Sequence, residues 1–231
     1  MRRHVAALAA AIAVVGCAAS RDHPGTGPSA LWTIVSRCVD RQTAAYCSCP
    51  PFELSCCGNP STPDADVVWA RTADFVVIRD LRMCGCPPGF VSGLAMPVTR
   101  VSGIEDPRRP EGIWAFAWEA ARARIPDERA IGLVLNPPDA RTQNQMHVHL
   151  LRLRAEVRPW LDGKAPAPPG VQVIPVQDLD AVFAAVQARV GADHMRDTGV
   201  LVARGRRGGW RAVLTDRTSP QAFTLNRCAG Q

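Results

Sequence analysis

Apolar residues recur along this chain at two different spacings, and each spacing predicts one kind of secondary structure. Spacings of three and four place apolar side chains on one side of a helix, and they occur in residues 30–39, 110–125 and 178–190. Alternating or β-branched runs are typical of strands, and they occupy residues 74–80, 93–98, 130–136, 143–150, 199–204 and 210–215. Short turns join several neighbouring strands, which favours antiparallel hairpins. The sequence therefore predicts an α+β fold with a mainly antiparallel sheet and packed helices.

The predicted helix after residue 110 should pack on this sheet. Pro110 and Glu111 suit its first turn, because proline is tolerated at the first helical position and an acid interacts favourably with a helix N-terminus. Trp114 and Trp118 lie four residues apart on its apolar side. We expect both indole rings in the core rather than in a binding site.

The stretch from Arg141 to Leu150 carries the alternation with the most chemical content. Side chains on a strand point alternately to its two faces. One face of a half-buried strand would carry Gln143, Gln145, His147 and His149, and the other would carry Met146, Val148 and Leu150. Neighbours on one face lie roughly 6.6–7 Å apart, so two of them can flank a single phosphoryl group. The row predicts an anion site that contains a nucleophile.

This stretch resembles the active-site strand of the histidine-triad (HIT) superfamily, in which three histidines alternate with apolar residues. Gln145, His147 and His149 fill the three polar places, and Gln145 departs from the first histidine. The run from Leu135 to His149 is similar to one branch in particular, the bacterial CDP-diacylglycerol diphosphatases. The resemblance implies a HIT-like fold for a single catalytic domain over residues 31–231, in which residues 161–231 are a C-terminal elaboration.

The resemblance also implies a reaction and a set of site residues. His147 would attack the CMP phosphorus of CDP-diacylglycerol and form a covalent nucleotidyl-histidine, phosphatidate would leave, and water would release CMP. His149 and Gln145 would donate hydrogen bonds to phosphoryl oxygens. The implied substrate-binding residues are Asn136, Arg141, Thr142, Gln143 and Arg100. No metal ion and no other cofactor is expected.

Other interpretations of the two histidines remain open at this point. They can form a solvated strand face, or they can be two of three zinc ligands, although the remaining candidates, His4, His23 and His194, are poorly placed in the sequence. The chain can also be a nucleotide- or phospholipid-binding lipoprotein that has lost turnover. Hydrolysis in the presence of chelator separates these classes. A HIT-like enzyme continues to cleave its substrate, a metal enzyme stops, and a binding protein never cleaves it.

The first seventeen residues predict an export signal. Arg2 and Arg3 precede an apolar run from Val5 to Val15 that is too short to span a bilayer, which needs ~20 residues. The run leads into a sequence similar to a bacterial lipobox, which would place a lipid on Cys17. Residues 18–30, rich in Ser, Pro and Gly, would be the tether. A simple cleaved signal or an uncleaved anchor is the alternative, and in each case the domain leaves the cytoplasm.

The remaining cysteines are consistent with export. They number eight: Cys38, Cys47, Cys49, Cys56, Cys57, Cys84, Cys86 and Cys228. Their spacings do not match a zinc ribbon, and an even number in an exported chain predicts disulfides. Residues 46–66 would be a cysteine-rich loop. One expected bridge joins the N-terminal region to Cys228, because closing a long loop should stabilise most.

Composition narrows the class of partner. The chain has 231 residues, of which 47% are hydrophobic, and a formal net charge of +6, which suits one globular domain with a mildly basic surface. Such a surface fits phosphate-bearing substrates and anionic membranes. Because the arginines are scattered and no stacking-aromatic pattern occurs, nucleic-acid binding is not expected. Composition leaves the oligomeric state undetermined.

The lipobox-like sequence makes a first prediction. Metabolic labelling with a fatty acid should label the wild-type chain and should not label the Cys17→Ser variant. Equal labelling of both chains, or none in the wild type, would show that the anchor is absent.

Overall fold

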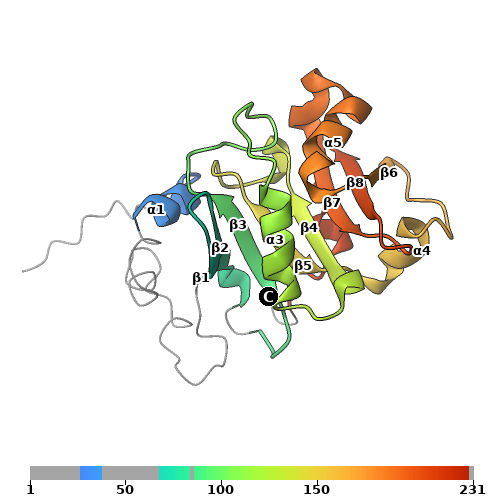
Figure 1. Ribbon diagram of the computed structural model, residues 1–231, viewed down its shortest axis with the longest axis horizontal. Helices are drawn as coiled ribbons and strands as arrows, with labels where there is room; N and C mark the ends of the chain where they lie inside the picture. Colours follow the sequence, from blue (N-terminus) through green and yellow to red (C-terminus); the bar gives the residue numbers. More distant parts are fainter. Residues whose placement is uncertain (1–26, 38–67, 84–85, 229–231) are drawn as a thin grey trace, which may run out of the picture.

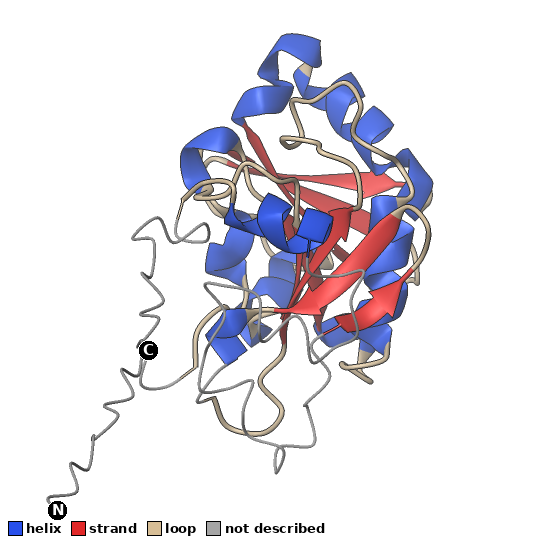
Figure 2. Cartoon of the chain, turned by 90° about the vertical axis from the view of Figure 1, so that its left-hand side faces the viewer, coloured by secondary structure: helices blue, strands red, loops and turns tan. Residues whose placement is uncertain are grey.

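The computed structural model describes residues 27–37, 68–83 and 86–228, which form one sheet with helices on both faces (Figures 1 and 2). In this part of the chain the sheet has eight strands in the order β1-β2-β3-β5-β4-β7-β8-β6. All neighbouring strands pair antiparallel. The predicted α+β class with a mainly antiparallel sheet is confirmed.

The elements have the following bounds. The strands are β1 Val68–Arg71, β2 Phe75–Arg79, β3 Ser92–Pro97, β4 Ile131–Leu135, β5 Val148–Arg152, β6 Val171–Val176, β7 Thr198–Arg204 and β8 Trp210–Asp216. The helices are α1 Ala30–Arg37, α3 Ile113–Arg122, α4 Arg158–Leu161 and α5 Val182–Val190. Two 3₁₀ turns bear on the site, Leu81–Met83 and Pro220–Phe223. No helix of the described segments is long and apolar enough to cross a membrane.

Two elements differ from expectation. Helix α3 begins at Ile113 with Gly112 as its N-cap, so Pro110 and Glu111 precede the helix instead of opening it. Strand β6 was not predicted, and it contains Pro175, which has no N–H to donate. Proline is tolerated on an edge strand, and β6 is the last strand of the sheet, paired only with β8 among the described strands.

One face of the sheet is covered by α3 and α5, and Figure 1 shows α3 lying across it. Trp114 and Trp118 of α3 are buried in the core cluster between these helices and the strands. Val148 and Leu150 of β5 point into the same cluster. Both tryptophans therefore occupy the core as predicted. This apolar layer packs against one face of β5.

The opposite face carries two separate apolar clusters. In one, Ile34 of α1 packs with residues of β2 and β3 such as Met96. In the other, Trp160 of α4 packs with residues of β4 and β7 such as Leu201. The histidines precede and occupy β5, the strand between β3 and β4. The histidines therefore lie on this face of the sheet, between the two apolar clusters.

The histidine strand is shorter and more buried than predicted. It begins at Val148, because residues just before it bond outside the sheet ladder: Met146 N–H donates to the carbonyl of Val101 at 2.7 Å. Gln145, His147 and His149 are only 0%, 7% and 5% exposed. The prediction of a half-buried strand over 143–150 is wrong, since chain segments cover both faces here.

A disulfide joins Cys86 to Cys228, 142 residues apart. It confirms the expected bridge to Cys228 and ties the C-terminal segment to the connection that follows β2. The remaining cysteines, Cys17, Cys38, Cys47, Cys49, Cys56, Cys57 and Cys84, lie outside the described residues.

Gly199 of β7 allows the segment that carries Ser219 and Gln221 to approach the sheet. A Cβ at this position would lie 2.6 Å from the carbonyl oxygen of Thr218 and 2.7 Å from Cδ of Pro220. We predict that Gly199→Ala lowers the free energy of unfolding by about 1–3 kcal/mol, because the backbone must shift to admit the methyl group. Urea unfolding measures it, with Gly209→Ala as the control because a Cβ there meets nothing within 4 Å. Equal stability of both variants would contradict this packing.

Candidate active site

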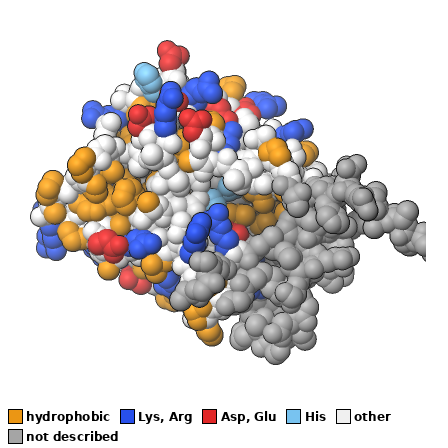
Figure 3. Space-filling view, turned by 180° about the vertical axis from the view of Figure 1, so that it is seen from behind, with side chains coloured by type: hydrophobic (Ala, Val, Ile, Leu, Met, Phe, Trp, Pro, Cys, Tyr) orange, Lys and Arg blue, Asp and Glu red, His pale blue; other side chains and the backbone are white. Residues whose placement is uncertain are grey.

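A cavity of about 410 Å³ opens between the two apolar clusters, beside the histidines. Its walls come from α1, the end of β2, the connection between β4 and β5, and the C-terminal segment. Its lining residues are Ala30, Leu31, Asp80, Arg82, Leu94, Asn136, Ala140, Arg141, Thr142, Gln143, His147, His149, Ser219, Gln221, Asn226 and Arg227. Figure 3, seen from behind, shows a histidine surface in a hollow with basic side chains next to it. The cavity thus joins imidazoles, amides and cations, as an anion site requires.

The ring of His147 is oriented by a backbone carbonyl. Its Nδ1 lies 2.7 Å from the carbonyl oxygen of Gln145. A carbonyl only accepts, so Nδ1 must carry the proton and donate it. In the neutral ring the lone pair is then on Nε2, which has no hydrogen bond among the described residues. His147 lines the cavity, so this lone pair is available at the cavity wall.

The ring of His149 has the same tautomer for a different reason. Nη1 of Arg82 donates to Oε1 of Gln221 at 3.1 Å, which fixes the orientation of that amide. The amide nitrogen of Gln221 then faces Nε2 of His149 at 2.8 Å and donates to it. Nε2 is therefore an acceptor, and the proton of the neutral ring lies on Nδ1. The two imidazoles contact each other with ring centroids 4.8 Å apart.

Both histidines are held in the neutral form. Burial lowers the pKa of His147 below its ordinary value, although the hydrogen bond to the Gln145 carbonyl and the charge of Asp80 act in the opposite direction. Burial, the neighbouring His147 and the charge of Arg82 lower the pKa of His149 further. The site therefore keeps an unprotonated imidazole available at neutral pH.

Asn136 and Gln143 are both fixed by bonds outside the strand ladder. Oγ of Ser219 donates to Oδ1 of Asn136 at 2.7 Å. The amide N–H groups of Asn136 then remain as donors toward the cavity that it lines. Oε1 of Gln143 accepts from the N–H of Leu31 at 3.1 Å, and its amide nitrogen donates to the Gly27 carbonyl. Gln143 therefore holds the start of α1 against the site.

Arg141 reaches the cavity as part of a partly buried ion pair. Its Nη1 and Nη2 bind the two carboxylate oxygens of Glu105 at 2.9 and 2.5 Å. Burial raises the pKa of Glu105, but the hydrogen bonds and charge of Arg141, together with hydrogen bonds from the Glu105 backbone and Ser102, lower the pKa overall. Gly103 has no side chain and leaves room for the guanidinium group. The pair fixes Arg141 in place and balances its charge.

A model of the family described as CDP-diacylglycerol pyrophosphatase matches residues 26–230 of this chain. The chain belongs to this family. Its members are hydrolases that act on a phosphoric anhydride. The matched residues include the whole cavity lining.

Among solved structures, the chain is similar to yeast Ap4A phosphorylase Apa2. The free enzyme is 12% identical with a TM-score of 0.43, and the complex with AMP is 14% identical with the same TM-score. Each alignment covers 66% of this chain. The chain spans 61% of the length of those structures.

Eight residues were predicted from the sequence to form the site, and six of them line the cavity. These six are His147, His149, Asn136, Arg141, Thr142 and Gln143. Gln145 is not in the lining, and its amide nitrogen donates to the carbonyls of Pro97 and Thr99, each at 2.9 Å. Arg100 is exposed, and its guanidinium carbon lies 5.9 Å from the centroid of the Trp32 ring. The structure therefore separates these two side chains from the cavity.

Polar residues also reach the cavity from distant segments that the sequence patterns did not connect with it. They are Asp80, Arg82, Ser219, Gln221, Asn226 and Arg227. Asp80 ends the predicted strand 74–80, Arg82 follows it, and the others follow the last predicted hairpin. No spacing in the sequence connects these segments. The nearby Cys86 and Cys228 were the available signal, because their bridge places both segments together.

The described residues contain no group of three or more His, Cys, Asp or Glu side chains that could hold a metal ion. Such a group is what the zinc interpretation of His147 and His149 requires.

The bonding pattern predicts the protonation state of both rings. In ¹⁵N NMR spectra of histidine-labelled protein, His147 and His149 should be neutral Nδ1–H tautomers, and both should titrate below the unperturbed pKa of about 6.5. Spectra of His147→Gln and His149→Gln assign the signals, and exposed His194 is the internal reference. A titration at or above 6.5, or an Nε2–H tautomer for His147, would contradict the geometry.

Proposed function

We propose that this chain hydrolyses the pyrophosphate bond of CDP-diacylglycerol to CMP and phosphatidate, through a covalent nucleotidyl-histidine on His147 and without a metal ion. The observation that carries the proposal is the bond from Nδ1 of His147 to the Gln145 carbonyl. This bond leaves Nε2 as the unshared lone pair of a neutral, buried ring. An oriented and unprotonated imidazole is what nucleophilic catalysis at phosphorus needs.

In the first step Nε2 of His147 forms a bond to the cytidine-side phosphorus. The bond from this phosphorus to the bridging oxygen breaks, and its electron pair stays on that oxygen. Phosphatidate leaves as a phosphomonoester. The positive charge that develops on the imidazolium ring is stabilised by the Gln145 carbonyl, which accepts the Nδ1–H bond at 2.7 Å.

In the second step water attacks the same phosphorus. The phosphorus–nitrogen bond breaks, its electrons return to Nε2, and one proton from water goes to solvent. CMP leaves and the neutral ring is restored. Because His147 lies at the cavity wall, with the cavity open to solvent in Figure 3, water can reach the intermediate.

Fixed donors supply the charge stabilisation that a metal ion would otherwise provide. Asn136 and Gln221 present amide N–H groups at the cavity wall, and Arg141 presents a guanidinium group held by Glu105. Donors that need not reorganise stabilise phosphoryl charge best. His149 sits beside the nucleophile with its Nε2 bound to Gln221. This arrangement supports metal-independent turnover.

The lipid anchor belongs to the same proposal. Cys17 precedes helix α1 by thirteen residues, which span at most about 45 Å when extended. Ala30 and Leu31 of α1 line the cavity. An acylated Cys17 would thus keep the site within reach of a bilayer that contains the lipid substrate.

Replacement of His147 should reduce activity more than replacement of His149. With CDP-diacylglycerol in detergent micelles and excess EDTA, His147→Ala should abolish turnover, because it removes the group that forms the bond. His149→Ala should slow turnover without abolishing it, because His149 contacts the ring of His147 and binds Gln221 through Nε2 but does not form the bond to phosphorus. The control is His194→Ala, an exposed histidine whose side chain is not in the cavity.

Three results would overturn this assignment. Substantial EDTA-resistant activity in His147→Ala would exclude it as the nucleophile. Activity that requires an added divalent ion, and that both cavity variants lose equally, would favour the metal-ligand interpretation. Wild-type protein that binds CDP-diacylglycerol and never cleaves it would be a binding protein.

A further inference from the structure

We propose that Arg227 and Arg82 form a subsite for the second phosphate of the substrate, the one that leaves as a phosphomonoester, and that the Cys86–Cys228 disulfide holds the two arginines on one side of the cavity. The subsite rests on the proposed function and assigns a role to residues outside the histidine strand.

The two arginines come from distant parts of the chain and meet at the cavity. Arg82 lies in the 3₁₀ turn that follows β2, and Arg227 precedes Cys228 directly. Both line the cavity that contains His147. The disulfide brings the Cα atoms of Cys86 and Cys228 to 5.7 Å, so it fixes the C-terminal segment against the turn that carries Arg82.

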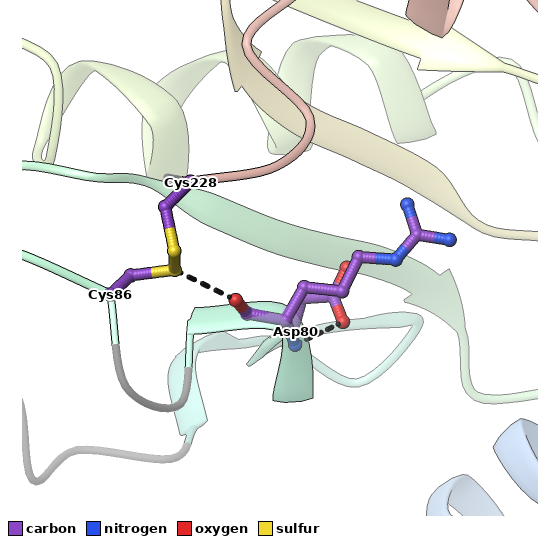
Figure 4. The surroundings of a disulfide bond; sticks show 4 residues. Asp80, Cys86 and Cys228 are labelled. Atoms are coloured by element: carbon purple, nitrogen blue, oxygen red, sulfur yellow. Dashed lines mark hydrogen bonds between the residues drawn. A yellow bond between two sulfur atoms is a disulfide. The ribbon is translucent and has the colours of Figure 1, made fainter. Parts of the chain in front are cut away.

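Further contacts hold the turn in this place. Sγ of Cys86 lies 3.1 Å from the carbonyl oxygen of Arg82, next to Asp80 (Figure 4). A disulfide sulfur has no proton to donate, so this is a sulfur–oxygen contact. The carboxylate of Asp80 accepts from the backbone N–H of Arg82 and from the hydroxyl of Ser92. The position of Arg82 is therefore set by the disulfide on one side and by a buried carboxylate on the other.

Arg82 is also linked to the chemistry. Its Nη1 donates to Gln221, and Gln221 donates to His149, at 3.1 and 2.8 Å. This chain of two hydrogen bonds places the guanidinium group beside the reacting strand. A phosphate that leaves the cytidine-side phosphorus toward the C-terminal segment would meet Arg82 and Arg227, which both line the cavity and are both exposed to solvent.

The distribution of charge favours an anion at this end of the cavity. Among the described residues of the lining there are three arginines and one carboxylate, Asp80. Arg141 is balanced by Glu105. Arg227 forms no ion pair with another described residue, so it contributes positive charge at this end of the cavity.

The negative charge of the leaving phosphate explains why arginine side chains would stabilise it here. In the intact pyrophosphate the second phosphate carries one negative charge, and a further charge develops on the bridging oxygen as its bond to the cytidine-side phosphorus breaks. Donors aimed at that oxygen bind the transition state more tightly than the substrate. Because the second pKa of a phosphomonoester is about 6, the group can leave at neutral pH without a general acid.

The subsite is tested with three substrates of the purified wild type and Arg227→Gln. CDP-diacylglycerol and CDP-choline both contain the second phosphate, one with lipid and one without, whereas the 4-nitrophenyl ester of CMP lacks it. We expect kcat/KM to fall at least ~10-fold for both pyrophosphates, which is less than the ~10²–10³ typical for loss of one buried donor because Arg227 is exposed. The fall for the ester should be much smaller. Arg207→Gln, an exposed arginine of the β7–β8 turn, is the matched control.

The outcomes separate the subsite from the proposed function. An equal loss for all three substrates, no loss for any, or a loss confined to the lipid substrate would overturn the subsite while the wild type still turns over. Wild-type protein that cleaves none of the three would overturn the proposed function itself.

A second variant tests the role of the disulfide. Cys86→Ser/Cys228→Ser should show the same selectivity, losing activity on both pyrophosphates more than on the ester. Retained cleavage of the ester shows that this variant is folded. Unchanged activity on the pyrophosphates in such a protein would contradict the claim that the bridge positions the arginines.

Discussion

The proposed chemistry of this molecule depends on one hydrogen bond, from Nδ1 of His147 to the carbonyl oxygen of Gln145. The bond selects the tautomer, orients the ring and leaves Nε2 facing the cavity. It forms because residue 145 is itself anchored, with its side-chain amide bound to the carbonyls of Pro97 and Thr99. A glutamine in the place of the first histidine therefore serves, in this structure, to fix the backbone that orients the second one.

Burial makes this hydrogen bond effective. An imidazole in water would be partly protonated near pH 6.5, whereas desolvation lowers the pKa of His147 and keeps its lone pair free. Strand β5 alone cannot provide this burial, because one of its faces would meet solvent. The segment from Ser219 to Cys228 provides it by crossing that face, with Gln221 bound to His149 and Cys228 bound to Cys86. The C-terminal segment thus covers histidines that lie about seventy residues earlier in the sequence.

Sequence analysis predicted what short-range patterns determine. Runs such as 130–136 and 199–204 gave the strands, the pair Trp114 and Trp118 gave the core side of α3, and the resemblance around His147 gave the family. Tertiary contacts determine the rest. The strand around His147 begins late because Met146 bonds to Val101 outside the ladder. Gln145 and Arg100 are separated from the cavity by the bond to Pro97 and by the exposed position at the end of β3. Arg82, Gln221 and Arg227 reach the cavity through long-range contacts that no local periodicity encodes.

The central claim is that His147 becomes covalently bound to the nucleotide. Substrate labelled in its cytidine moiety, mixed with enzyme and denatured within one turnover without acid, should leave label on the peptide that contains His147. The adduct should be lost on mild acid treatment, as a phosphoramidate is, and absent from His147→Ala. Turnover without label on any residue, or label on a residue other than His147, would contradict the account.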